Sequence, residues 1–400
     1  MTSGNGAANQ HGDISQTGDH GVNIAHTGTG NINMRFWGSA PTHAICWVVA
    51  AAAIATAPLL LSTDSPPGGT LDGATGTVTL VWQYHGPPAV IFPLASGGIE
   101  YCTHSDSRWW LPWSAPTIDP SAPVIGHSTV FASDYSGFEM LGTDDGTLTY
   151  AWRGNYLDHF RWHGPGPVLV DGDPLQNVTG RPGFLQYPIY RPAEIPQFLA
   201  LVPQRAGGLG LYRRVEPGPF DWGPKRLGVV ASQLGLINSV TAVRTPDGAL
   251  VAVLRVGSRL YKLTHPRGNL PADFGIGWSK PTEVRIAAGG FVSVTGDPAF
   301  ASSEASTSQL DLIAPVPGGL ALLTAANSAS PWSLQRLPIH QPVESAGVLG
   351  GEVHGRLNID IIYRSGSQLY SIWKWDGGAW HQPAIVTWGP SGRWAKATRP

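Results

Sequence analysis

Short apolar runs of four to seven residues recur along this chain, and each is followed by a glycine-containing turn and a second apolar run. The first large apolar residue after each turn, called the anchor here, recurs at intervals of 49, 61, 51, 60 and 49 residues. The anchors are Ile99, Leu148, Leu209, Leu260, Leu320 and Leu369. Two apolar strands joined by a glycine at positive φ make a β-hairpin, so the pattern predicts six hairpins.

A tryptophan follows each anchor after 11 to 18 residues, and four of these corner tryptophans begin a W-x-x-P sequence. They are Trp113, Trp162, Trp222, Trp278, Trp332 and Trp380. A repeat of about 45 to 60 residues with three or four short strands is typical of a β-propeller blade, which buries both faces only by stacking on neighbours in a ring. We expect the corner tryptophans to be buried between blades.

The fold class predicted is therefore all-β, a β-propeller of six blades. A seventh blade would have to lie in one of the two longer stretches, Trp162 to Leu209 or Trp278 to Leu320. To close the ring, we expect Thr77 to Gln83 and Pro383 to Pro390 to pair within one blade, which leaves no free sheet edge.

The turn-strand sequences GTLTYAW and GSQLYSIW, the tryptophan-proline corners, and the segments VTGRPGF and VTGDPAF resemble the blade motif of the PLL-type bacterial β-propeller lectins and their tectonin-like relatives. The resemblance covers about residues 76 to 395. It implies pockets at blade interfaces that bind monosaccharides such as fucose by aromatic stacking and polar contacts. This chain departs from the family in having six units rather than seven. It also departs in the strand position four residues after the anchor, which is aromatic at two of its six occurrences: Thr103, Trp152, Arg213, Thr264, Thr324 and Trp373.

A sugar pocket needs an apolar plate for the C–H face of the ring and fixed polar groups for its hydroxyls. Three groups of residues offer such a combination, and simple packing between blades is the alternative for each. The first group is Trp152, Arg153, Asn155, Tyr156 and Asp158; the second is Trp373, Trp375 and Asp376; the third is Trp109 and Trp110. We predict carbohydrate or glycoconjugate as the partner.

The first 43 residues contain few large apolar side chains, and we expect a disordered Gly/Asn-rich tail. Within it, GDISQTGDHGVNIAHTGTGNINM carries two alternating bursts, Val-Asn-Ile and Ile-Asn-Met. This segment loosely resembles bacterial amyloid signalling motifs, and the resemblance implies self-association by cross-β stacking. A soluble tail is the alternative.

The segment AICWVVAAAAIATAPLLL is uncharged, and we interpret residues 44–62 as one transmembrane helix. A cleaved signal ending at Ala55 to Ala57 and a buried soluble helix are the alternatives. Arg35 before the helix and Asp64 and Asp72 after it favour a cytoplasmic N-terminus and an extracytoplasmic propeller. Residues 63–75 have the composition of a linker, so the propeller is expected over residues 76–400.

Charge and motifs exclude several function classes. A net charge of -2 with no basic run argues against nucleic-acid binding. Cys46 and Cys102 make neither a disulfide framework nor a cysteine-based zinc site, and no cofactor fingerprint is present.

Metal binding and glycoside hydrolysis are two further chemistries for which the sequence has candidate residues. We interpret the group Asp158, His159 and His163 as surface residues rather than a metal site. A propeller glycosidase needs a pair of carboxylates, and the acidic residues expected in blades show no common spacing that gathers two of them: Glu139, Asp158, Asp311 and Asp360. The sequence thus predicts a non-enzymatic, membrane-anchored recognition protein. Self-assembly through the tail, glycoside hydrolysis and a purely structural scaffold remain the alternatives.

Overall fold

A computed structural model describes part of the chain, which divides into two units, Met1–Asp64 and Ser65–Pro400. The described residues are 23–26, 32–35, 69–70, 74–82, 88–94, 99–103, 117–119, 125, 127–133, 137–153, 162–187, 197–214, 223–245, 248–266, 272–301, 309–353, 356–375 and 378–388.

In the second unit, four-stranded antiparallel sheets follow one another along the chain, each with its strands paired in sequence order. We number these sheets 1 to 6 in chain order. Sheet 1 contains β4 (Thr79–Trp82), β5 (Pro88–Pro93), β6 (Ile99–Thr103) and β7 (Thr117–Asp119). Sheet 2 contains β8 (His127–Ser133), β9 (Gly137–Asp144), β10 (Thr147–Arg153) and β11 (Trp162–Pro167). Sheet 3 contains β14 (Gly183–Tyr187), β15 (Gln197–Pro203), β16 (Leu209–Arg214) and β17 (Lys225–Val230).

The second half of the unit repeats this arrangement. Sheet 4 contains β18 (Ser239–Arg244), β19 (Leu250–Val256), β20 (Arg259–His265) and β21 (Thr282–Glu283). Sheet 5 contains β22 (Ala299–Phe300), β23 (Leu310–Val316), β24 (Gly319–Ala325) and β25 (Ser333–Arg336). Sheet 6 contains β26 (Ser345–Val353), β27 (Arg356–Ser365), β28 (Gln368–Trp375) and β29 (Ala384–Ile385). Smaller elements are β12 (Leu169–Val170), β13 (Asp173–Pro174) and the 3₁₀ turns η2 (Ser232–Leu234) and η3 (Ala272–Gly275).

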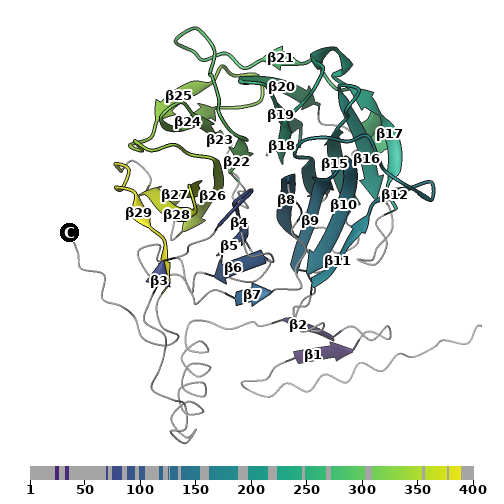
Figure 1. Ribbon diagram of the computed structural model, residues 1–400, viewed down its shortest axis with the longest axis horizontal. Helices are drawn as coiled ribbons and strands as arrows, with labels where there is room; N and C mark the ends of the chain where they lie inside the picture. Colours follow the sequence, from purple (N-terminus) through teal and green to yellow (C-terminus); the bar gives the residue numbers. More distant parts are fainter. Residues whose placement is uncertain are drawn as a thin grey trace, which may run out of the picture. The chain divides into compact units, whose positions relative to one another are not determined.

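The sheets form a closed ring. The first strand of each sheet contacts the first strand of the next, and β26 of sheet 6 contacts β4 of sheet 1. In Figure 1 the labelled first strands β4, β8, β18, β22 and β26 lie nearest the centre, and the later strands of each sheet lie farther out. The prediction of an all-β propeller is confirmed.

The anchors begin or nearly begin the third strand of each sheet, and the hairpins lie where the apolar pattern predicts them. Leu148, Leu209, Leu260, Leu320 and Leu369 are buried. The turn glycines Gly146, Gly257 and Gly366 have φ of 76°, 58° and 62°, the conformation that glycine adopts without steric cost. The hairpin signal is therefore local, because the turn and its two flanking strands are contiguous in sequence.

The corner tryptophans whose side chains are described contribute to the hydrophobic clusters between neighbouring sheets. Trp162 packs with residues of sheets 1 and 2, and Trp332 with residues of sheets 4 and 5. Trp278 and Trp380 are partly buried against the clusters between sheets 3 and 4 and between sheets 5 and 6. These four residues confirm the packing role expected for them.

The ring closes differently from the expectation that Thr77 to Gln83 and Pro383 to Pro390 share a blade, which is wrong. β4 is the innermost strand of sheet 1, whereas β29 is the outermost strand of sheet 6. The end of the chain pairs elsewhere: β3 (Gly69–Thr70) and β30 (Thr387–Trp388) form a separate two-stranded sheet. Such short strands have no apolar periodicity from which they could be predicted.

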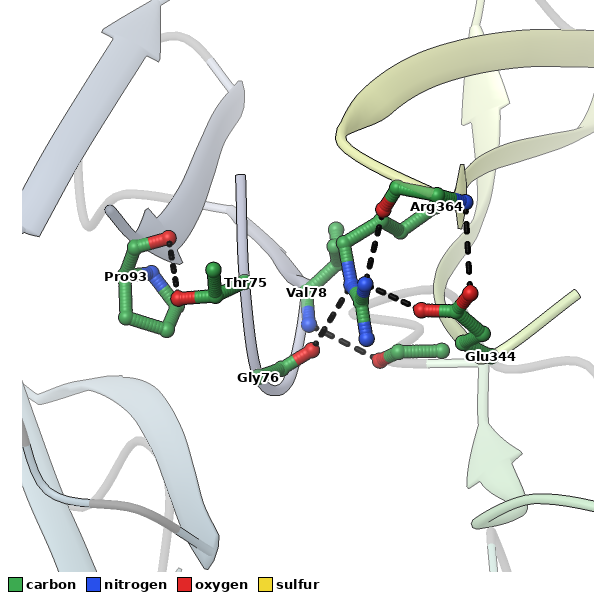
Figure 2. A network of polar contacts seen from close by, with 8 residues as sticks. Thr75, Gly76, Val78, Pro93, Glu344 and Arg364 are labelled. Carbon is green, nitrogen blue, oxygen red and sulfur yellow. Dashed lines mark hydrogen bonds and ion pairs between the residues drawn. The ribbon is translucent and has the colours of Figure 1, made fainter. Parts of the chain in front are cut away.

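Polar contacts join the segment before β4 to sheet 6 (Figure 2). The Val78 N–H donates to Ser345 Oγ at 2.8 Å, and Arg364 Nε donates to the Gly76 carbonyl at 3.1 Å. Arg364 also forms an ion pair with Glu344. On the other side of the segment, Thr75 Oγ1 donates to the Pro93 carbonyl at 3.3 Å. The ring is thus closed by side chains and packing between sheets 6 and 1.

The second unit also includes described residues before the predicted boundary at Gly76. The Ala74 N–H donates to the Ser367 carbonyl at 3.1 Å, and Ala74 is buried. Part of the predicted linker therefore belongs to the ring.

In the first unit the structure describes one hairpin, β1 (Asn23–His26) paired antiparallel with β2 (Ile32–Arg35). The rest of the predicted disordered tail lies outside the described residues, and so does the predicted transmembrane helix at 44–62. Among the residues that are described, none belongs to a helix with the length and apolar character needed to span a membrane.

Candidate functional site

The two tryptophans singled out by the family resemblance occupy the same position in their sheets. Trp152 pairs with Glu139 across β10 and β9, and Trp373 pairs with Asp360 across β28 and β27. Each tryptophan lies four residues after its anchor, and each carboxylate lies nine residues before that anchor. The two sites are therefore built on one register.

In sheet 2, Trp152 is stacked on His163, the residue that follows corner Trp162. The ring centroids are 3.9 Å apart and the interplanar angle is 11°. Trp152 is 7% exposed and belongs to the hydrophobic cluster between sheets 2 and 3. Arg153 is buried too, and its guanidinium lies 5.4 Å from the Phe138 ring centroid. Trp152 is thus packed between blades, and Arg153 packs on its cross-strand partner within sheet 2.

Beneath Trp152 lies a buried polar cluster that joins sheet 2 to sheet 3. The Tyr150 hydroxyl donates a hydrogen bond to Glu139 Oε2, and Arg214 Nη2 of sheet 3 lies 4.0 Å from Glu139 Oε1. The Arg214 guanidinium also covers the Phe198 ring at 3.8 Å. Burial and the neighbouring Glu139 charge raise the pKa of Tyr150 above its usual value, so this phenol stays protonated and donates.

In sheet 6 the equivalent aromatic group is open. Trp373 is stacked on His381, the residue after corner Trp380, with centroids 3.2 Å apart at an angle of 21°. Trp375, two residues farther along β28, lies 5.8 Å from Trp373 at 87°. Trp373 and Trp375 are both half-buried, whereas His381 is exposed. Two indoles set at right angles beside an exposed imidazole form an aromatic corner that solvent reaches.

Asp360 lies opposite Trp373 and is buried at the interface between sheets 6 and 1. Burial raises the pKa of this carboxyl well above its usual value. The position that Tyr150 occupies in sheet 2 is Ser371 in sheet 6, two residues after the anchor. The hydroxyl side chain at this position is therefore much shorter in sheet 6 than in sheet 2.

Several predicted site residues lie outside the described residues: Asn155, Tyr156, Asp158, Asp376, Trp109 and Trp110. His163 and His381 were not predicted as site residues, although both stand in a shared W-H-x-P sequence, WHGP and WHQP. Glu139, Asp311 and Asp360 each lie nine residues before an anchor, a regularity that was not used. This spacing places them on three different sheets, 2, 5 and 6, so it does not bring two of them onto one sheet.

The group Asp158, His159 and His163 is described only at His163, which stacks on Trp152. Across the described ranges, no three His, Cys, Asp or Glu side chains are grouped in a way that could hold a metal ion.

Comparison with known proteins identifies the fold but not a family. No protein-family profile matches the sequence, and no curated protein sequence matches it. Solved structures do match. A variant of the Aleuria aurantia lectin in complex with Fucα1-6GlcNAc has a TM-score of 0.52 at 14% identity, covering 80% of this chain and 100% of the lectin. A triple arginine-to-alanine variant of AofleA from Arthrobotrys oligospora has a TM-score of 0.54 at 10% identity, covering 81% of this chain and 90% of that one.

The SapL1 lectin in complex with alpha methyl fucoside has a TM-score of 0.50 at 11% identity, covering 80% of this chain and 99% of the lectin. At such low identities the likeness establishes a shared β-propeller architecture, and function has to be argued from the site itself.

Proposed function

We propose that this protein is a carbohydrate-binding propeller without catalytic activity, and that its six sheets act as the blades of a six-bladed ring. The observation that carries the proposal is the aromatic corner of sheet 6. The rings of Trp375 and half-buried Trp373 stand at 87°, and His381 stacks on Trp373. A sugar ring has one C–H face for an indole and several hydroxyls for a polar neighbour such as imidazole.

Fucosides are the first ligands to test. The resemblance of the blade motif to PLL-type lectins supports this choice. So do the fold neighbours, of which the Aleuria aurantia lectin is described with Fucα1-6GlcNAc and SapL1 with alpha methyl fucoside. At 14% and 11% identity these neighbours suggest the ligand class and do not identify the sugar.

The test is a glycan array probed with the full-length chain, followed by titration of the best ligand and of methyl α-fucoside. We expect Trp375→Ala and His381→Ala to weaken binding at least tenfold, because each removes one side of the corner. Phe291→Ala is the matched control, since Phe291 is an exposed aromatic elsewhere on the ring. Binding to no glycan on the array, or equal losses in all three variants, would contradict the proposal.

Glycoside hydrolysis is the competing enzymatic function. The carboxylates of Glu139, Asp311 and Asp360 lie on three separate sheets, and that of Glu139 accepts the Tyr150 hydroxyl hydrogen bond. A glycosidase needs two carboxyl groups within about 5–10 Å across one bond. Turnover of aryl glycosides by the purified chain would replace the binding proposal with an enzymatic one.

A second candidate function, self-assembly, is favoured by the β1–β2 hairpin of the first unit. The two alternating bursts of the tail pair there in register, with Ile24 opposite Met34. We propose that this hairpin associates between chains through its free backbone edges. The full-length chain should then form thioflavin-positive fibres with a repeat of about 4.7 Å, and Ile24→Pro should prevent them. A wild-type chain that stays monomeric at high concentration would remove this function.

We also propose that residues 44–62 anchor the protein in a membrane with the propeller on the extracytoplasmic side. Protease treatment of intact cells should digest the propeller and spare the N-terminal tail. Digestion only after lysis would reverse the orientation.

A further inference from the structure

The ring alternates between two kinds of sheet. In sheets 1, 3 and 5 the residue opposite the anchor is a proline: Pro93, Pro203 and Pro315. In each of these sheets a threonine before the first strand donates its backbone N–H to that proline's carbonyl, at 2.8, 3.0 and 2.9 Å. These threonines are Thr75, Thr179 and Thr295.

Sheets 2, 4 and 6 share a different arrangement. The residue opposite their anchors is Thr143, Arg255 or Arg364, and its side chain contacts the segment just before the first strand of the following odd-numbered sheet. Thr143 Oγ1 donates to the Gly180 carbonyl at 2.8 Å, and Arg364 Nε donates to the Gly76 carbonyl at 3.1 Å. Arg255 Nε donates to Asp297 Oδ1 at 3.0 Å. Gly76, Gly180 and the residue before Asp297 each follow one of the three threonines.

The anchor intervals carry the same alternation. From odd to even sheets they are 49, 51 and 49 residues, and from even to odd sheets 61 and 60. The ring is therefore a threefold array of two-blade units, and its interfaces fall into two classes. The interfaces at which an even sheet meets the following odd sheet are 2/3, 4/5 and 6/1.

The candidate ligand groups belong to one class. Sheets 2 and 6 each carry a tryptophan four residues after the anchor, a carboxylate opposite it and a histidine after the corner tryptophan. In sheet 4 the three equivalent positions hold Thr264, Val251 and Ser279. The equivalence is set by the backbone, because Ser279 N–H donates to the Thr264 carbonyl at 2.8 Å, as His381 N–H does to the Trp373 carbonyl at 3.0 Å.

All three side chains are present together in sheets 2 and 6 and absent together in sheet 4. In sheet 4 the two rim positions are tied to each other instead, since the Thr264 N–H donates to Ser279 Oγ at 2.9 Å. The tryptophan and the histidine occur together in sheets 2 and 6 and at neither position in the other four, whereas the carboxylate position is also acidic in sheet 5, at Asp311. Independent packing choices would not change as a pair, whereas two parts of one ligand site would.

We infer that ligand binding is confined to the even-to-odd interfaces, with a site at 6/1, a second and weaker site at 2/3, and a third at 4/5 that has lost its binding side chains. The inference rests on the proposed carbohydrate function and assigns its sites. The site at 2/3 is the weaker one because its tryptophan is 7% exposed, whereas that at 6/1 is half-buried beside an exposed histidine.

The number of bound ligands tests this assignment. Native mass spectrometry of the full-length chain with methyl α-fucoside should show two bound molecules. Trp373→Ala should reduce this number to one bound molecule and abolish the tighter of the two binding events. Thr264→Trp combined with Ser279→His should raise the number to three, and adding Val251→Asp to that pair tests whether the carboxylate tightens the new site. Circular dichroism and thermal melting confirm that each variant is folded.

The possible outcomes separate the two proposals. No binding by the wild-type chain to methyl α-fucoside or to any arrayed glycan removes the carbohydrate function and this assignment with it. Binding that persists with unchanged stoichiometry in Trp373→Ala overturns the assignment and leaves the function standing. The same holds if Arg213→Ala or Thr324→Ala, the equivalent changes in sheets 3 and 5, removes a bound ligand while Trp373→Ala does not.

Discussion

The 2/3 interface and the 6/1 interface use the same strand positions, but the tryptophan is buried in the first and accessible to solvent in the second. At 2/3, Glu139 accepts a hydrogen bond from Tyr150 and lies near Arg214, and Trp152 is buried beside them. At 6/1, Asp360 stands opposite a tryptophan that solvent still reaches, and the neighbouring sheet is held by Arg364 at the rim. The same strand register can therefore form either a buried interface or a solvent-accessible aromatic group, depending on three or four side chains.

The largest expected effect comes from disrupting the buried polar cluster of the 2/3 interface. Arg214→Ala leaves the Glu139 carboxylate buried without its cation, which should cost about 3–5 kcal/mol in free energy of unfolding. Urea denaturation followed by tryptophan fluorescence measures this cost. The double variant Glu139→Leu/Arg214→Met should lose much less, because it removes both charges. A cost below about 1 kcal/mol for the single variant would mean that the charges contribute little to the joint.

The tryptophans of the two interfaces should rank in opposite orders for stability and for binding. Trp152→Ala should cost about 3–5 kcal/mol because it empties a buried volume. Trp373→Ala should cost roughly 1–2 kcal/mol, since less apolar area is lost. In sugar titrations Trp373→Ala should have the greater effect. Equal stability losses would show that the 6/1 interface is as tightly packed as its counterpart.

The two carboxyls should also differ in how stability responds to pH. Burial raises the pKa of Asp360, so the folded protein holds this proton to a higher pH than the unfolded chain, whose carboxyl titrates near 3.8. The contribution of Asp360 to the free energy of unfolding therefore falls as pH rises from about 4 to its folded-state pKa, and is constant above it. Asp360→Asn should stabilise the protein at pH 7 and change little below pH 4.

Asp173→Asn, at an exposed carboxyl, is the control for that experiment and should be nearly neutral at both pH values. An Asp360→Asn variant that is destabilised at pH 7 would indicate that the ionised carboxylate stabilises the fold.

The smallest effect is expected at the rim of the 6/1 interface. Glu344 is 46% exposed, so its ion pair with Arg364 is screened by solvent. Glu344→Ala should cost about 0.2–1 kcal/mol, and less at 1 M salt. Arg364→Ala should cost more, because the hydrogen bond to the Gly76 carbonyl is lost as well. Thermal melting at two salt concentrations distinguishes these terms.

The hairpins were predictable from sequence because each is local: apolar strand, glycine turn and anchor lie within one short segment. The site depended on the register between the second and third strands, which sets Glu139 opposite Trp152 and Asp360 opposite Trp373. The spacing of nine residues from carboxylate to anchor contains this register, but it gains meaning only once the strand pairing is known. Burial of Trp152 was beyond sequence reasoning, because it is determined by Phe198, Tyr212 and other residues of the next sheet.

The closure of the ring was mispredicted for a related reason. A strand of two residues, such as β3 or β30, has no periodicity, and the contacts of Arg364 and Ser345 with the segment before β4 span more than 260 residues. Long-range polar contacts between side chain and backbone leave no pattern in a single sequence.

The small β3–β30 sheet places Gly69–Thr70 beside Thr387–Trp388. A circular permutant that joins these two segments by a short peptide and is cut instead at the exposed turn of Pro317 and Gly318 should form the same ring, because the joined segments already lie side by side. Its chain ends would then lie between β23 and β24 of sheet 5, and a protein fused there would extend from that sheet instead of from the β3–β30 pair.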